Sequence, residues 1–191
     1  MEQGINRLRL PFWLQWILAT AIGMGFGYEV ARIVSPATQG LLFLSVPGIF
    51  MGCLQWLVLK KRVNVRGWWV LATFSAFLIF DLVGWIVPSQ VKPLIGQIFL
   101  ALGGLTLGFT QWLLLRHHYA RAHQWILANT LAWLLGMILA FCGVAISVSL
   151  SELSGVGLYG LSGFTMAVFF GTPLGAVTAY VLNRLSAQHM S

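Results

Sequence analysis

Charged residues are scarce in this chain. Only 8% of its 191 residues are Asp, Glu, Lys or Arg, and just four of those are acidic. A soluble domain usually carries about 25% charged residues. Hydrophobic residues make up 59% of the chain and its mean hydropathy is +0.86. This balance excludes a domain with a mostly water-exposed surface and predicts a protein of the lipid bilayer.

Cysteine and membrane-embedded histidine are also nearly missing. The two cysteines, Cys53 and Cys142, lie in different apolar segments and at different predicted depths, so we expect no disulfide. No metal-ligand spacing or haem-attachment motif is present, and we predict no metal. All four histidines fall in hydrophilic joints or the tail: His117, His118, His123 and His189. The cofactor is therefore unknown, with lipid binding, or pigment binding through Asn129 or a glutamine, left open.

Six apolar runs of roughly 20 to 26 residues, each long enough to cross a bilayer, make up most of the chain. They are predicted near residues 11–34, 40–59, 67–87, 94–115, 124–148 and 157–183. Backbone groups in lipid must be satisfied within the segment, so each run should be a helix. The first run is too long for a signal peptide and reads as a retained helix. We predict an all-α, polytopic single domain over residues 1–191.

The basic residues predict the orientation of these helices. The net charge is +7, but the basic residues occupy the short joints instead of forming a nucleic-acid-binding face. Two of the eleven, Arg32 and Lys92, fall on one side of the predicted membrane. Nine fall on the other side: Arg7, Arg9, Lys60, Lys61, Arg62, Arg66, Arg116, Arg121 and Arg184. Positive residues favour the cytoplasm, so both termini should be cytoplasmic.

An internal repeat links the helices. Shifting the sequence by 56 places residues 48–78 over 104–134 with eleven identities in 31 positions. Gly52-x-x-Gln55-Trp56-Leu57-x-Leu59 matches Gly108-x-x-Gln111-Trp112-Leu113-x-Leu115, and Trp69-x-Leu71-Ala72 matches Trp125-x-Leu127-Ala128. The first helix carries a related start at Trp16, and the last keeps small residues at Ala167 and Gly171. We predict three repeated hairpins, the third degenerate, related by an axis along the membrane normal.

This Gly-x-x-Gln-Trp-Leu-x-Leu-(Lys/Arg) pattern, followed by Trp-Trp-Val-Leu-Ala, resembles a family of small uncharacterised bacterial membrane proteins built from such hairpins. The resemblance covers residues 48–135 well and the rest loosely. It implies the hairpin fold and a bacterial inner (plasma) membrane, or an internal photosynthetic membrane. It implies no activity and no functional residues.

Two sets of apolar and aromatic residues have a structural and a functional interpretation. Small residues recur one turn apart, which predicts close helix packing around a central axis or a face for a partner; they are Gly48, Gly52, Gly104, Gly108 and Gly171. The Gln-Trp pairs at 15–16, 55–56, 111–112 and 124–125, with Trp68-Trp69, lie near the cytoplasmic edge. They predict a tryptophan belt, with ligand stacking as the alternative.

Ionisable residues in the outer half form the one candidate polar site. Asp81 should lie about 21 Å from the cytoplasmic end of its helix, and Glu29 and Arg32 are one turn apart on the first helix. With Gln97 they make a candidate outer polar cluster. Arg32 is the expected partner of Asp81, although it could neutralise Glu29 or both. The cluster predicts either a structural lock between helices one and three or a site for a small solute or ion.

The sequence contains no nucleophile–base pair and no metal cage, so we predict that the protein is not an enzyme. The first expectation is a non-catalytic accessory or assembly subunit of a membrane complex. The alternative is a small-solute-binding or transport component with its site near Asp81. Expected partners are the lipid bilayer and other membrane proteins or further copies of the chain, but no nucleic acid.

Overall fold

The computed structural model describes residues 10–38, 40–63, 65–87, 90, 92–154 and 159–188. Within this range it describes no side chain for residues 92–101, 147, 154, 159–162, 187 or 188. The described chain is all-α, with six α-helices and a short 3-10 helix at Ser35–Thr38. The helices are α1 (Phe12–Val34), α2 (Ser45–Leu59), α3 (Trp68–Ile86), α4 (Lys92–Leu115), α5 (Gln124–Ser154) and α6 (Tyr159–Gln188).

The predicted helix positions hold, with one late start and two extensions. α2 begins at Ser45, five residues after the predicted 40, because Gly40 adopts a positive φ of 82° and residues 40–44 form turns. α5 and α6 run longer than predicted, with 31 and 30 residues. At about 1.5 Å per residue each exceeds the ~30 Å hydrocarbon thickness of a bilayer.

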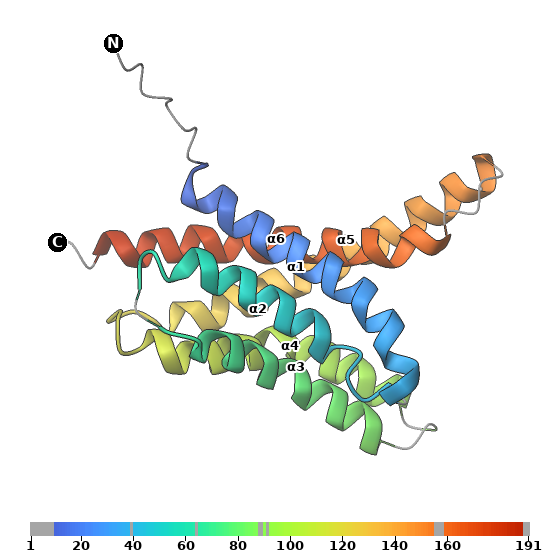
Figure 1. Ribbon diagram of the computed structural model, residues 1–191, viewed down its shortest axis with the longest axis horizontal. Coiled ribbons are helices and arrows are strands. Elements are labelled where there is room, and N and C mark those ends of the chain that lie inside the picture. The colour runs from blue at the N-terminus through green and yellow to red at the C-terminus, as the bar shows by residue number, and fades with distance from the viewer. Residues whose placement is uncertain are drawn as a thin grey trace, which may run out of the picture.

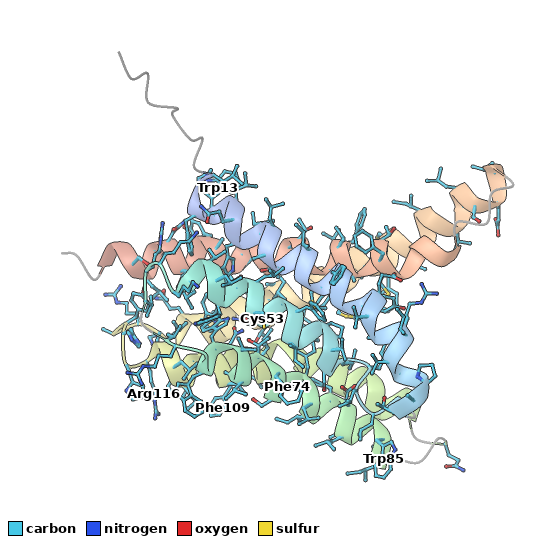
Figure 2. All side chains as sticks on the ribbon, in the orientation of Figure 1. Trp13, Cys53, Phe74, Trp85, Phe109 and Arg116 are labelled. Carbon is cyan, nitrogen blue, oxygen red and sulfur yellow. The ribbon has the colours of Figure 1, made fainter. Side chains whose placement is uncertain are left out.

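Four segments in the described chain are long and apolar enough to cross a membrane: Phe12–Thr38, Trp68–Ile86, Gln124–Leu153 and Gly163–Ser186. Ser45–Leu59 and Leu102–Leu115 are shorter apolar helices. A multi-pass membrane protein follows from these segments. Large apolar side chains on the outside of the bundle agree with lipid as its solvent; Phe109, for example, is 50% exposed (Figure 2).

The six helices form a closed ring. Each described helix packs against the helices before and after it in the chain, and α6 returns to pack against α1 (Figure 1). We call the end that holds residues 60–63, 65–67 and 116–123 the basic end, where Arg116 lies (Figure 2). The other end, near Trp85, is the opposite end. There the last part of α5 and the first part of α6 project away from the other helices (Figure 1).

Glycines bring the ring helices into backbone contact at equivalent places. A Cβ atom on Gly52 of α2 would lie 3.2 Å from the Cα of Val70 on α3. On Gly108 of α4 it would lie 2.8 Å from the Cα of Ile126 on α5. The predicted packing glycines therefore face neighbouring helices inside the ring, where small residues allow close approach.

The same contact closes the ring between α6 and α1. A Cβ atom on Gly175 would lie 2.8 Å from the Cα of Ile17. Val70, Ile126 and Ile17 each follow a tryptophan in the sequence, so the three contacts occupy the same repeat position. Gly171 and Gly175 thus correspond to Gly48 and Gly52 of α2. The sequence alignment, which matched Ala167 and Gly171 instead, was wrong by one helical turn.

Candidate functional site

Three tryptophans meet in the ring interior toward the basic end. Trp16, Trp69 and Trp125 come from α1, α3 and α5 and are at most 1% exposed. Their ring centroids are 5.9 to 6.1 Å apart, and every pair has an edge-to-face geometry. The predicted tryptophan belt is therefore wrong for these three residues. Trp68, beside Trp69 in sequence, is 61% exposed and does face outward.

Each indole of this triangle donates a hydrogen bond to the helix that precedes it around the ring. Trp69 Nε1 donates to Gln55 Oε1 at 3.1 Å, and Trp125 Nε1 donates to Gln111 Oε1 at 3.0 Å. Trp16 Nε1 donates to Thr178 Oγ1 at 2.9 Å. A threonine on α6 thus occupies the place that a glutamine holds on α2 and α4.

Each of the two glutamines also donates a hydrogen bond to a third helix, the one that precedes its own helix in the chain. Gln55 Nε2 donates to Thr20 Oγ1 on α1, and Gln111 Nε2 donates to Thr73 Oγ1 on α3, both at 2.9 Å. Both ends of each buried amide are therefore used to join three helices. Buried polar groups that bond to one another in this way stabilise a unique packing of the helices. We call these residues the tryptophan–glutamine network.

The candidate outer polar cluster is not assembled as predicted. Arg32 Nη1 lies 3.1 Å from Glu29 Oε2, in a pair one turn apart on α1 whose side chains are 46% and 37% exposed. This is one of the two pairings left open for Arg32. Asp81 instead finds its partners on α2, so the expected Arg32–Asp81 ion pair was wrong. The side chain of Gln97 lies outside the described residues.

Asp81 is buried and holds the start of α2. Its Oδ1 accepts a hydrogen bond from the N–H of Leu44 at 2.9 Å. Its Oδ2 accepts from the N–H of Ser45 at 2.6 Å and from Ser45 Oγ at 2.5 Å. The first N–H groups of a helix lack internal partners and carry partial positive charge, so a carboxylate is favoured there. A residue on α3 therefore acts as the cap of α2, in place of a capping residue on α2 itself.

Beside Asp81, the ring contains an apolar cavity of about 140 Å³ at the level of the opposite end. Residues from five helices or their connections line it, and the lining is entirely apolar or aromatic in character. The list is Met24, Tyr28, Phe43, Leu44, Pro47, Phe77, Phe80, Trp133, Met137, Met166, Ala167 and Phe170. No sequence pattern predicted this cavity, because its walls come from helices far apart in the chain.

A crevice of about 310 Å³ adjoins this cavity. Its lining combines one carboxylate with aromatic rings: Gly40, Phe43, Leu44, Phe80, Asp81, Gly84 and Trp85. Phe43, Leu44 and Phe80 line both spaces, so they form the wall between the crevice and the cavity. A carboxylate therefore lies next to an apolar space of molecular size. Ser45 could have been suspected from sequence as a helix start, since Pro47 follows it two residues later.

In the described part of the chain, no group of three or more His, Cys, Asp or Glu residues is placed to hold a metal ion. Cys53 is half-buried, Cys142 is exposed, and both are free thiols.

Comparison with known proteins yields no match to a protein-family model, to a curated protein or to a solved structure. The resemblance described from the sequence therefore stays a prediction.

Proposed function

We propose that this protein is a non-catalytic, multi-pass membrane protein that binds a small solute in the outer half of its helix ring. In this proposal all six helices span the membrane as three repeated hairpins, and the basic end faces the cytoplasm. The nine-to-two distribution of basic residues supports that orientation. Phe43, Leu44 and Phe80 then lie in the outer half, with the cavity and the crevice.

One observation carries the proposal: the apolar cavity adjoins a crevice that contains a buried carboxylate. Small-molecule sites are concave and mostly apolar, with a few polar groups that fix orientation. An engineered apolar cavity of about 150 Å³ in another protein binds benzene. The cavity beside Asp81 has about that size, and side chains from five helices or their connections line it. Three of these side chains are methionines, which adapt to the shape of a ligand.

A second candidate is an accessory or assembly subunit of a membrane complex. The tryptophan–glutamine network favours it, because the buried polar groups at the basic end bond to one another and join helices. Purification from the native membrane without added ligand separates the two. A stoichiometric protein partner supports the subunit, and a bound small molecule supports the solute-binding protein.

Filling the cavity tests the proposed function. Purified protein in detergent should show a higher midpoint of thermal unfolding as ethylbenzene is added, because a ligand that binds only the folded state stabilises it. Met137→Trp should fill the cavity and abolish that shift. Ile138→Trp is the matched control, since Ile138 is 61% exposed and lies on the outside of the same helix. It should respond to ethylbenzene like the unsubstituted protein. An equal shift in both variants would contradict the proposal.

A further inference from the structure

The chemistry of the crevice restricts what can bind there. Asp81 is its one charged lining residue, and neither Lys nor Arg lines it among the residues described. Three donors, the N–H of Leu44, the N–H of Ser45 and the hydroxyl of Ser45, converge on this carboxylate. Two of the three are backbone N–H groups, which can only donate, and donors of this kind favour the ionised form of the carboxyl group.

The carboxylate keeps capacity for a further donor. An ionised carboxylate has about four acceptor positions on its two oxygens. Oδ2 receives both bonds from Ser45 and shares the N–H of Leu44 at 3.1 Å, whereas Oδ1 receives a bond only from that N–H, at 2.9 Å. Because Asp81 also lines the crevice, a donor on a ligand can bond to the acceptor position that remains on Oδ1. The partial positive charge of the α2 end is worth about half an elementary charge, so it offsets the carboxylate only in part.

Aromatic rings supply the rest of the crevice wall. Phe43, Phe80 and Trp85 line it together with Asp81. The faces of such rings attract cations, and aromatic walls are a common means of recognising organic ammonium groups. The same wall repels an anion, which would also meet the carboxylate. The crevice therefore favours positive charge, while the adjoining cavity favours an uncharged apolar group.

We infer that the ligand is a small hydrophobic amine, bound with its ammonium group at Asp81 in the crevice and its apolar group in the cavity. This inference rests on the proposed function. The cavity volume of about 140 Å³ limits the apolar group to about the size of one benzene ring. Phe43 and Phe80, which line both spaces, lie beside the linker between the two groups of the ligand.

The test compares three probes that share a phenyl group and differ in charge: 2-phenylethylamine, 2-phenylethanol and 3-phenylpropionate. Binding to the full chain in detergent is measured by calorimetry and by the midpoint of thermal unfolding at pH 7. We expect the amine to bind at least about tenfold more tightly than the alcohol, which corresponds to ~1.4 kcal/mol. The propionate should bind more weakly than both.

A charge placed in the crevice provides the matched variants. Gly84 lines the crevice, and a Cβ atom there would meet nothing within 4 Å, so a side chain fits without displacing Asp81. Gly84→Lys should remove the preference for the amine by neutralising the carboxylate. Gly84→Met, of similar length without charge, should weaken the binding of amine and alcohol alike and leave the ratio of their affinities unchanged. Asp81→Asn should also remove the preference, but it weakens the start of α2, so the Gly84 pair decides if Asp81→Asn does not fold.

The outcomes separate the inference from the proposed function. Equal binding of amine and alcohol, in the unsubstituted protein and in both Gly84 variants, would contradict the inference that the ligand is an amine. The proposed function, binding of a small apolar solute, would remain. Binding of none of the three probes, together with no response to ethylbenzene, would overturn both. If Gly84→Lys keeps the preference for the amine, the ammonium group of the ligand binds elsewhere, and the inferred role of Asp81 in binding it is wrong.

Discussion

The two ends of the helix ring keep the internal repeat to different degrees. At the basic end, equivalent positions carry the same or similar residues and the same hydrogen bonds, as with Trp16, Trp69 and Trp125. Three turns further along the same helices, the equivalent residues are Tyr28, Asp81 and Met137. An aromatic, an acidic and a thioether side chain therefore replace one another at a single repeat position.

All three of these diverged residues line the cavity or the crevice. A repeat that only had to pack could keep one residue type at this level, as it does at the tryptophan level. Divergence at one level removes the approximate symmetry and creates a space with distinct walls. We infer that the basic end stabilises the ring, while the residues at the opposite end have diverged around the cavity and the crevice.

Replacing a tryptophan of the triangle should cause the largest loss of stability. Trp69→Ala removes a fully buried indole, and such truncations cost about 3–5 kcal/mol; it also leaves Gln55 Oε1 without its donor. Trp68→Ala is the matched control, because Trp68 is 61% exposed and should change the free energy of unfolding little. Unfolding in mixed detergent followed by circular dichroism measures both. Similar losses for the two neighbours would contradict a structural role for the basic end.

The next prediction concerns the capping of α2 at the opposite end. Asp81→Asn places an amide donor opposite the N–H groups of Leu44 and Ser45, and loss of a cap costs about 0.5–2 kcal/mol. Ser45→Ala should lose less when made in Asp81→Asn than when made alone, because the two side chains share a hydrogen bond.

Arg32→Gln serves as the control for this cycle. Arg32 pairs with Glu29 in a largely exposed geometry, and such pairs contribute about 0–1 kcal/mol. Its effect should add to that of Asp81→Asn, measured as the free energy of unfolding of the single and double variants. Recovery of stability in the double variant would instead indicate that Arg32 and Asp81 form an ion pair in the unsubstituted protein.

The sequence predicted the helices well and the site only in part, for physical reasons. Apolar run length and the scarcity of charge locate the helices, since the bilayer imposes its thickness on each run. The repeat also predicted Gly52 and Gly108 as packing positions, where their contacts with α3 and α5 now lie. These signals are local or periodic, and both can be read along the chain.

The hydrogen-bond and ion-pair partners of buried side chains could not be predicted in this way. Arg32 was the expected partner of Asp81 by depth, but hydrogen-bond donors of the α2 backbone take that place, and backbone groups carry no sequence signature. The triangle of tryptophans was mistaken for a membrane belt because depth alone does not say whether a side chain faces lipid or the ring axis. Thr178 was missed because it substitutes for a glutamine that is two side-chain carbons longer.

This last substitution gives the smallest and most specific prediction. Gln111→Thr gives α4 the residue that α6 uses at the equivalent place, where Thr178 accepts the indole hydrogen bond of Trp16. At this level the two helix pairs approach equally closely, because a Cβ atom on Gly108 or on Gly175 would lie 2.8 Å from a Cα atom of the neighbouring helix. A threonine at 111 should therefore reach Trp125 Nε1, and only the bond to Thr73 is lost.

We expect Gln111→Thr to cost about 0.5–1.5 kcal/mol, the usual net contribution of one hydrogen bond. Gln111→Leu keeps the bulk of the side chain but strands the buried indole N–H of Trp125, so it should cost more, about 1–3 kcal/mol. Unfolding free energies and the fluorescence of the buried tryptophans distinguish the two. If threonine is as costly as leucine at this position, the pairing of α6 with α1 is not equivalent to that of α4 with α5. The repeat would then hold for two pairs of helices and not for the pair that closes the ring.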